Sequence, residues 1–293
     1  MKYRSGKRNI KKAAAPIATA VFVIVAALFV WDVWIRNDAQ ELSADCEFHF
    51  IDVGQGDSTL IVTKDAAVLI DAGPTDAAET TARYIRRYTD CIDYMILTHP
   101  HEDHIGGAVK IINSLEVENV IMTDASNDVI TFSRLIGVIE DSGVRVVEAQ
   151  AGNTYDAGGI ALQILAPLAD LDDFNEYSVV TRVEYGNVSA IITGDAEEGS
   201  EELMVQTYTS GELDGDILKL GHHGSQTSST SAFLAAVSPR WAVASCGRDN
   251  PYGHPHQQTL ERARELKIPV LRTDEMGTIV FATDGEDVWL KDQ

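Results

Sequence analysis

Apolar, β-branched runs alternate with helical patterns from residue 46 to the C-terminus, and this alternation constrains the fold more than any other feature. Two runs come first, EFHFIDVGQGDSTLIVT and AAVLIDAG, and a Lys64-Asp65 turn between them predicts a hairpin. Strands and helices then alternate along the chain. A second hairpin, with its turn at Tyr185-Gly-Asn187, is again followed by alternating strands and helices. Hairpins in each half predict mixed sheets. We expect one α/β domain over residues 46–293, with two mixed sheets packed together and helices outside.

The expected helices and strands follow from the period of the apolar residues. The predicted helices cover residues 77–89, 104–115, 128–142, 229–239 and 259–268. The predicted strands outside the two hairpins cover residues 92–98, 117–123, 144–149, 160–167, 215–221, 240–247, 268–273, 277–283 and 287–292.

An uncharged apolar segment separates a basic leader from an acidic body. Residues 1–36 hold seven Lys or Arg and one acid, whereas the remaining residues hold 16 bases and 44 acids, a net charge of −28. The 19 residues from Ala13 to Trp31 carry no charge and, at about 1.5 Å per helical residue, nearly span a hydrocarbon core of about 30 Å.

The positive charge before this segment predicts that the N-terminus stays in the cytoplasm. We therefore expect a cytoplasmic leader over residues 1–12, a single transmembrane helix over 13–35, a linker over 36–45 and an extracytoplasmic body in the cell membrane. The alternative is a signal peptide whose cleavage would release a secreted protein, although the run is long and no A-x-A site follows it.

Three cysteines, Cys46, Cys91 and Cys246, show no C-x-x-C spacing. This argues against a cysteine-based zinc site or redox pair and favours buried thiols. One disulfide, formed outside the cell, is the alternative.

Residues 99–104 read His-Pro-His-Glu-Asp-His and crowd metal-ligand side chains together. In an extended loop alternate side chains point the same way, so His99 and His101 can share one ion. Asp103 and His104 begin the following helix and suit a second ion. Two-metal hydrolytic sites keep their ions about 3.5–4 Å apart. Asp195, which follows a glycine at the end of a hairpin strand, is the candidate for a bridging carboxylate.

Two further polar clusters also follow predicted strands, at Gly221-His-His-Gly-Ser225 and Tyr252-Gly-His-Pro-His256. Loops at strand ends can aim their side chains at one point because the sheet beneath them is rigid. His49, within a strand, and His256, after a proline, are expected to be structural.

Several of these patterns together resemble a known family. The H-x-H-x-D-H pattern, with Asp71-Ala-Gly before it and Thr193-Gly-Asp after it, resembles the metallo-β-lactamase superfamily. Over residues 47–283 the segments Asp52-Val-Gly-Gln-Gly-Asp57, His104-Ile-Gly-Gly, His222-His-Gly-Ser and Tyr252-Gly-His-Pro-His are similar to the metallo-hydrolase domain of the ComEC/Rec2 competence proteins. The resemblance implies an αβ/βα sandwich and a two-metal hydrolase.

Carried over by position, the resemblance implies six metal ligands: His99, His101, Asp103, His104, Asp195 and His222. His223 and His254 are rivals for the last position. Whichever of these imidazoles is not a ligand is expected to contact the substrate or to protonate the leaving group. The expected catalytic residues are therefore Asp103, His223 and His254.

One departure concerns the first site. Many members have another histidine between the cluster and the bridging aspartate, whereas this chain has Asn175-Glu-Tyr-Ser178 in that stretch. The first site is therefore poor in ligands, and it is expected to bind its ion weakly or to use an oxygen ligand and accept Mn²⁺ in place of Zn²⁺. The expected cofactors are two divalent ions, Zn²⁺ or Mn²⁺.

The remaining site residues are expected to support the ligands or the substrate. A carboxylate often holds the distal nitrogen of a ligand imidazole, which is the role expected for Asp71. Asp52 is expected to be structural. The residues expected to contact the substrate or to support the ligands are Gln55, Asp57, Asn175, Ser178 and Ser225.

Two bound cations would lower the pKa of a shared water and supply hydroxide, so the chain is expected to be a hydrolase. The resemblance favours a phosphodiesterase of nuclease type, although the acidic body argues against tight binding of duplex nucleic acid. The competence proteins carry a multi-helix channel that this chain is not expected to share. The alternatives are hydrolysis of an ester, lactone or lactam, and a non-catalytic metal-binding sensor.

Overall fold

The computed structural model describes residues 40–291. The predicted leader, the predicted transmembrane helix and the first residues of the predicted linker lie outside these residues. Within the described part, none of the helices is both long and apolar enough to span a bilayer.

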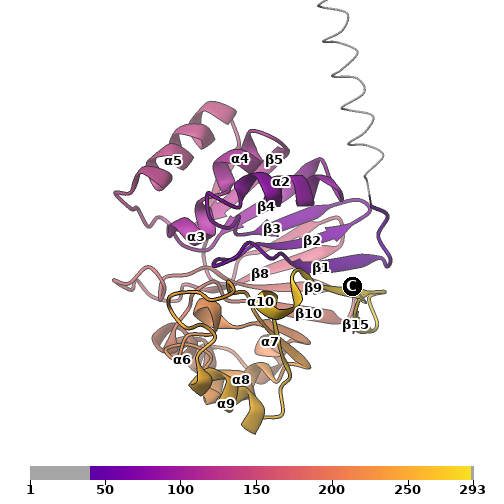
Figure 1. Ribbon diagram of the computed structural model, residues 1–293, viewed down its shortest axis with the longest axis vertical. Helices are drawn as coiled ribbons and strands as arrows, with labels where there is room; N and C mark the ends of the chain where they lie inside the picture. The colour runs from indigo at the N-terminus through magenta and orange to yellow at the C-terminus, as the bar shows by residue number, and fades with distance from the viewer. Residues whose placement is uncertain (1–39, 292–293) are drawn as a thin grey trace, which may run out of the picture. The chain divides into compact units, whose positions relative to one another are not determined.

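The first of two mixed sheets has eight strands in the order β15-β14-β1-β2-β3-β4-β5-β6 (Figure 1). Its strands pair antiparallel from β15 to β3 and parallel from β3 to β6. The strands are β1 (Cys46–Phe50), β2 (Thr59–Thr63), β3 (Ala67–Ile70), β4 (Cys91–Leu97), β5 (Glu116–Met122), β6 (Arg145–Glu148), β14 (Ile279–Thr283) and β15 (Val288–Leu290).

The second sheet has seven strands in the order β13-β12-β11-β10-β9-β8-β7. It is parallel from β13 to β10 and antiparallel from β10 to β7, so each sheet combines a parallel half with an antiparallel half. The strands are β7 (Thr154–Ala157), β8 (Ile160–Ala166), β9 (Val180–Tyr185), β10 (Val188–Ile192), β11 (Ile217–Lys219), β12 (Trp241–Ala244) and β13 (Val270–Arg272).

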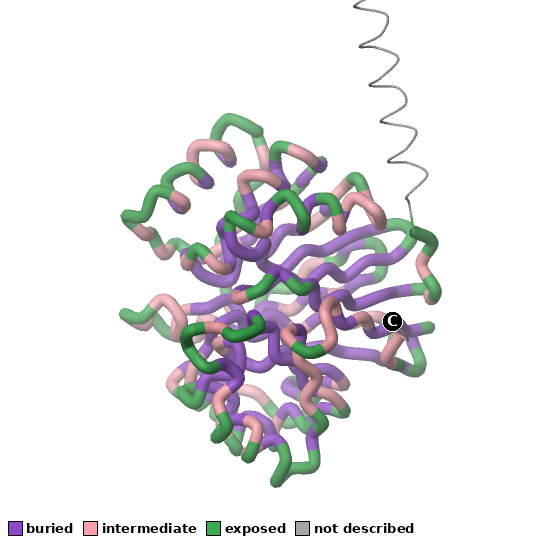
Figure 2. Tube along the Cα trace, in the orientation of Figure 1, coloured by how far each residue is buried: buried purple, intermediate pink, exposed green. Residues whose placement is uncertain are grey.

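Three apolar layers hold the sandwich together, and Figure 2 shows that the strands between the helices are mostly buried. One layer lies between the sheets, and each sheet packs its other face against helices. The helices on the first sheet are α2 (Ala78–Arg86), α3 (Glu102–Ile105), α4 (Ala108–Ile112) and α5 (Ile130–Ser142). Those on the second are α6 (Glu198–Thr207), α7 (Ser210–Leu213), α8 (Ser231–Val237) and α9 (Gln257–Glu265), and α10 (Thr273–Met276) follows β13. The predicted fold of two mixed sheets with outer helices is confirmed.

Local differences from the prediction have identifiable causes. The first predicted run is two strands, β1 and β2, with a loop between them that carries Asp57. The predicted helix 104–115 is broken after α3, because the Gly107 amide donates to the Gly73 carbonyl and the Asp103 carbonyl accepts from the Asp57 amide, in place of a helical bond between them. Helix α6 was not predicted, because its buried face includes Glu201 and so lacks an apolar period. Helices α7 and α10 and strand β7, each four residues long, were also not predicted.

Most of the polar loops leave the carboxyl ends of strands in the parallel halves; the exception is the β1–β2 loop with Asp57, in the antiparallel half of the first sheet. Strands β3 and β4 of the first sheet lead to Asp71 and to the 99–104 cluster. Strands β10, β11 and β12 of the second sheet lead to Asp195, to the His222-His223 pair and to the segment with His254. Because the sheets pack face to face, loops from both can reach one site.

Candidate metal centre

Asp195 lies at the centre of the polar cluster, and its side chain is buried. Its Oδ1 and Oδ2 atoms each face imidazole nitrogens, all of them Nε2. The distances are 3.2 Å from Oδ1 to His104, and from Oδ2 3.6 Å to His223, 3.7 Å to His222 and 3.9 Å to His99. Loops from both sheets therefore converge on one carboxylate.

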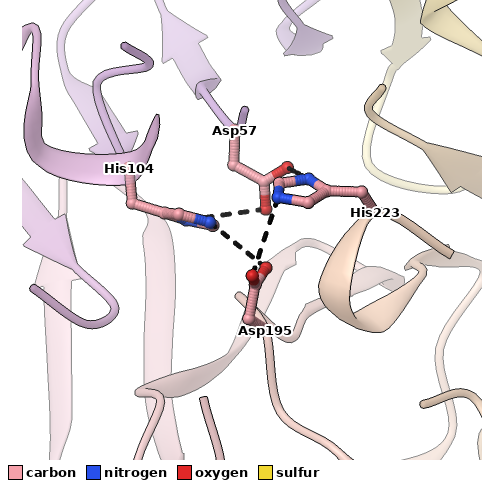
Figure 3. A group of neighbouring side chains, drawn as sticks. All are labelled: Asp57, His104, Asp195 and His223. Carbon is pink, nitrogen blue, oxygen red and sulfur yellow. Dashed lines mark hydrogen bonds and ion pairs between the residues drawn. The ribbon is translucent and has the colours of Figure 1, made fainter. Parts of the chain in front are cut away.

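The tightest group of possible ligands is Asp57, His104, Asp195 and His223, drawn in Figure 3. Each offers one ligand atom, and these atoms lie within 4.8 Å of one another. His104 Nε2 and Asp195 Oδ1 are buried and lack a hydrogen-bond partner among residues 40–291. Imidazole nitrogens and carboxylate oxygens that converge in this way fit a divalent metal ion.

Three imidazoles have a carboxylate behind them, on the side away from Asp195. The pairs join Nδ1 to a carboxylate oxygen and are His104–Asp71 at 2.7 Å, His222–Glu197 at 2.7 Å and His223–Asp57 at 3.1 Å. His223 Nδ1 also lies 3.0 Å from the Ser245 carbonyl oxygen, which can only accept, so this nitrogen carries the hydrogen. In their neutral forms, with the hydrogen on Nδ1, these imidazoles would direct their Nε2 lone pairs toward Asp195, as in metal sites whose ligand imidazoles are held by carboxylates.

The His99–His101 side of the centre is built differently. His99 Nδ1 faces two hydroxyls, Thr98 Oγ1 at 3.1 Å and Ser178 Oγ at 3.4 Å, and no carboxylate. His99 Nε2 lies 2.9 Å from His101 Nδ1. Asn175, predicted to support this side, instead lies beside the other one, with its Nδ2 3.4 Å from Glu197 Oε1 and 3.5 Å from His222 Nδ1.

Charge couples the buried groups. Burial by itself would lower the pKa of His104, but Asp195 and Asp71 outweigh it and hold that pKa well above its usual value. Burial would raise the pKa of Asp195, but His104 and His223 hold it well below its usual value. His99, in contrast, has its pKa lowered well below the usual value by burial and by His104.

A cavity of about 530 Å³ opens onto the cluster. Asp103 lies in its wall, with Oδ2 3.2 Å from His223 Nε2. His254 is also in the wall, and burial with the charges of His223 and His222 lowers its pKa to about 4, so its imidazole is neutral at pH 7. The other lining residues include Gln55, His101, Glu102, Asn127, Val129, Asn175, Asp195, His222, His223 and Tyr252.

The structure brings most of the predicted site residues together, but the two neighbouring histidines, His222 and His223, differ from the prediction. His223, not His222, belongs to the tightest group, although His222 also faces Asp195. Both have left-handed backbone angles, with φ of 46° and 56°, so the two neighbours turn into the same site. Which of them is a ligand stays a prediction.

Other predicted residues lie at the periphery. Ser225 is not in the cavity wall, and its hydroxyl pairs with Thr227. Asp52 accepts from the Gly54 amide and shapes the β1–β2 loop. His256 accepts from the Gln226 amide and faces the Tyr252 carbonyl, so both its nitrogens bind backbone.

Two residues of the centre were not predicted. Glu197, behind His222, belongs to an acidic run after Asp195, and its position there was the only indication in the sequence. Lys219 is fully buried on β11 and contacts Asp57, and its sole indication was one charge within the apolar run Ile217–Leu220.

Comparison with known proteins gives the family. A model of the metallo-beta-lactamase superfamily matches residues 51–248. The chain belongs to the metallo-β-lactamase superfamily. The fold and the candidate metal cluster together support a metal-dependent hydrolase with divalent metal ions as cofactors.

Two relatives of this metallo-β-lactamase-fold protein are similar over the whole body. It is 30% identical over 264 residues to ComE operon protein 3 of Bacillus subtilis, covering 82% of this chain and 33% of that protein. It is 33% identical over 246 residues to competence protein ComA of Neisseria gonorrhoeae, covering 78% of this chain and 31% of that protein. The chain therefore spans about a third of the length of these relatives.

A solved structure gives independent support for the fold. The metallo-beta-lactamase fold protein YhfI from Bacillus subtilis superimposes with a TM-score of 0.54 at 13% identity, covering 84% of this chain and 100% of that one. At this identity the likeness concerns the fold alone.

Proposed function

We propose that this protein is a metal-dependent phosphodiesterase of nuclease type. The observation that carries the proposal is the convergence of four imidazole Nε2 atoms on Asp195 at the base of a cavity. When bound, divalent ions there supply Lewis acidity and a water of lowered pKa. We propose Zn²⁺ or Mn²⁺; an ion held on the His99 side by oxygen ligands beside the imidazoles would favour Mn²⁺.

The residues of the chain have separate roles in this proposal. Asp195 and the imidazoles of His104 and His223 hold metal, while Asp71 and Asp57 fix the orientation of those imidazoles. His254 lies in the cavity wall, neutral at pH 7, and donates its ring hydrogen to an oxygen of the substrate. Asp103 contacts His223, one of the residues that hold metal in this proposal, and also lines the cavity that would receive the substrate.

A phosphodiester suits the charges of the molecule. The body is strongly acidic, so an anionic substrate needs positive charge that bound ions supply locally. The same acidic surface favours a small or single-stranded substrate over a duplex.

We further propose that residues 13–35 anchor the protein in the membrane, with the hydrolase body outside the cytoplasm. The apolar segment after a basic leader supports this. Protease added to intact cells is expected to digest the body of the membrane-bound protein, and a body protected in the cytoplasm would refute the proposal.

A neutral ester or lactone is the second candidate substrate. Two of the exposed large apolar residues in the described chain, Val129 and Tyr252, line the cavity, at 44% and 65% exposure. Apolar walls of this kind also suit an uncharged acyl substrate.

The deciding experiment compares two chromogenic substrates. Purified full-length protein, supplied with Mn²⁺ or Zn²⁺, is assayed with bis-p-nitrophenyl phosphate and with p-nitrophenyl acetate. Turnover of the phosphodiester is expected. Turnover of the ester alone would favour the second candidate, and tight metal binding without any turnover would indicate a sensor.

A further inference from the structure

Lys219 is a charged side chain inside the apolar core. It is the last residue of β11 and is 0% exposed. Because side chains alternate along a strand, Lys219 shares the face of Ile217, which packs in the layer between the two sheets. Its ammonium group therefore points from the second sheet toward the first. A buried charge is costly unless it is paired, so its partners matter.

The partners of Lys219 come from both sheets. Its Nζ contacts Asp57 Oδ2, from the β1–β2 loop of the first sheet. It also donates to the Gly194 carbonyl at 2.9 Å, in the turn that presents Asp195, and lies 3.9 Å from Asp195 Oδ1. The ammonium thus contacts one carboxylate of the tightest ligand group, Asp57, and lies near a second, Asp195.

These contacts indicate that Asp57 is a hydrogen-bond acceptor and not a metal ligand. Its Oδ1 faces His223 Nδ1 at 3.1 Å, and its Oδ2 faces the ammonium. Burial by itself would raise the pKa of Asp57, but Lys219 and then His223 lower it. Both oxygens of the carboxylate are therefore engaged by cationic or hydrogen-donating groups, even though the residue stands within ligand distance of the others.

We propose that Lys219 is a positioning residue that keeps Asp57 out of the metal coordination sphere and holds it as the acceptor for His223. The ammonium occupies the side of the cluster where a cation would otherwise bind Asp57. Its charge weakens cation binding there, and its bond to the Gly194 carbonyl fixes the turn before Asp195. The inference rests on the metal binding that the proposed function requires.

The test is the affinity of the protein for Mn²⁺, measured by calorimetry and electron paramagnetic resonance on chelator-treated full-length protein. Lys219→Met removes the charge and keeps a long side chain. Asp57 then becomes a buried carboxylate without a cation, and Mn²⁺ is expected to bind at least about 10-fold more tightly, with an altered spectrum. A purely structural lysine predicts the opposite, a loss of affinity.

Asp57→Asn gives a second test that does not depend on the folding of the first variant. It leaves the Lys219 charge uncompensated beside Asp195, so Mn²⁺ affinity is expected to fall about 10-fold. The double variant Lys219→Met with Asp57→Asn removes the pair together, and its affinity is expected to return to within about 3-fold of wild type.

The matched control is Lys64→Met, which removes the same charge from a side chain that is 86% exposed. Its Mn²⁺ affinity is expected to equal that of the wild type. If the double variant stays as weak as Asp57→Asn, Asp57 is a metal ligand and the proposal is wrong. If Lys219→Met binds no more tightly than wild type, the proposal is also wrong. A wild type that binds no metal would refute the proposed function instead.

Discussion

The two sides of the Asp195 cluster differ in what stands behind each imidazole. On one side, His104, His222 and His223 each have a carboxylate on Nδ1. On the other, His99 has only the hydroxyls of Thr98 and Ser178. A carboxylate makes an imidazole a better metal ligand and fixes its tautomer, whereas a neutral hydroxyl does so weakly. If the centre binds two ions, as the proposed function requires, this difference predicts that the carboxylate-backed position is the tighter one.

The largest effect is expected where the two sides meet. Asp195→Ala removes the carboxylate that faces imidazoles on both sides, so metal should be lost from both. The loss of metal affinity should exceed the roughly 10–100-fold that is typical of an outer-shell partner, and activity should vanish. Elemental analysis and the phosphodiesterase assay measure this. Asp172→Ala, at an exposed aspartate, is the control, and full metal content in Asp195→Ala would contradict the central role of Asp195.

Removing one carboxylate from behind an imidazole tests the tighter side by itself. Asp71→Asn takes the acceptor charge from His104 Nδ1, and metal affinity is expected to fall about 10–100-fold. Calorimetric titration with Zn²⁺ measures the tighter binding step. Asp76→Asn, at an exposed aspartate nearby in the sequence, should bind like wild type. An unchanged first step in Asp71→Asn would show that the carboxylates do not set the difference between the sides.

The tighter side should also give metal-free protein a distinct pH dependence. Burial lowers the pKa of His223, but Asp195 and Asp57 outweigh it and raise the folded value from 6.5 to about 9. The folded state then binds a proton more tightly than the unfolded state. This stabilisation is fully present below about pH 6.5 and is lost as the pH rises through about 9.

Thermal unfolding of chelator-treated protein between about pH 6 and pH 10 measures this loss, and His223→Gln should show a smaller one. Equal loss in the variant and the wild type would mean that other groups carry the pH dependence.

The smallest effect is expected on the hydroxyl-backed side. Ser178→Ala removes one neutral partner of His99, and a neutral hydrogen bond contributes about 1 kcal/mol, or about 5-fold in affinity. The weaker step of a Mn²⁺ titration should change more than the tighter step, which can change slightly because Ser178 Oγ also accepts from the Asp195 amide. A loss as large as that of Asp71→Asn would remove the distinction between the two sides.

Much of the site could be predicted from the chain itself. Residues 99–104 concentrate ligand side chains in one loop, and the alternation of strands and helices sends the later clusters to strand ends. A difference between the two sides was also predicted, because the resemblance to the superfamily implied a first site poor in ligands, with Asn175-Glu-Tyr-Ser178 in place of a histidine. Composition also separated a basic leader from an acidic body. The leader lies outside the residues that the structure describes.

The amino-acid sequence was enough to predict the candidate ligand residues, the loops that carry them and the fold family. The groups that lie behind the candidate ligands are fixed by the packing of the two sheets. Asp57 and Lys219 belong to different sheets, and their contact depends on how the sheets pack. The convergence of both His222 and His223 on Asp195 depends on left-handed backbone angles that no apolar pattern encodes. Local residues fix what a strand end can offer, but the distances between loops of distant segments exist only after the core has packed.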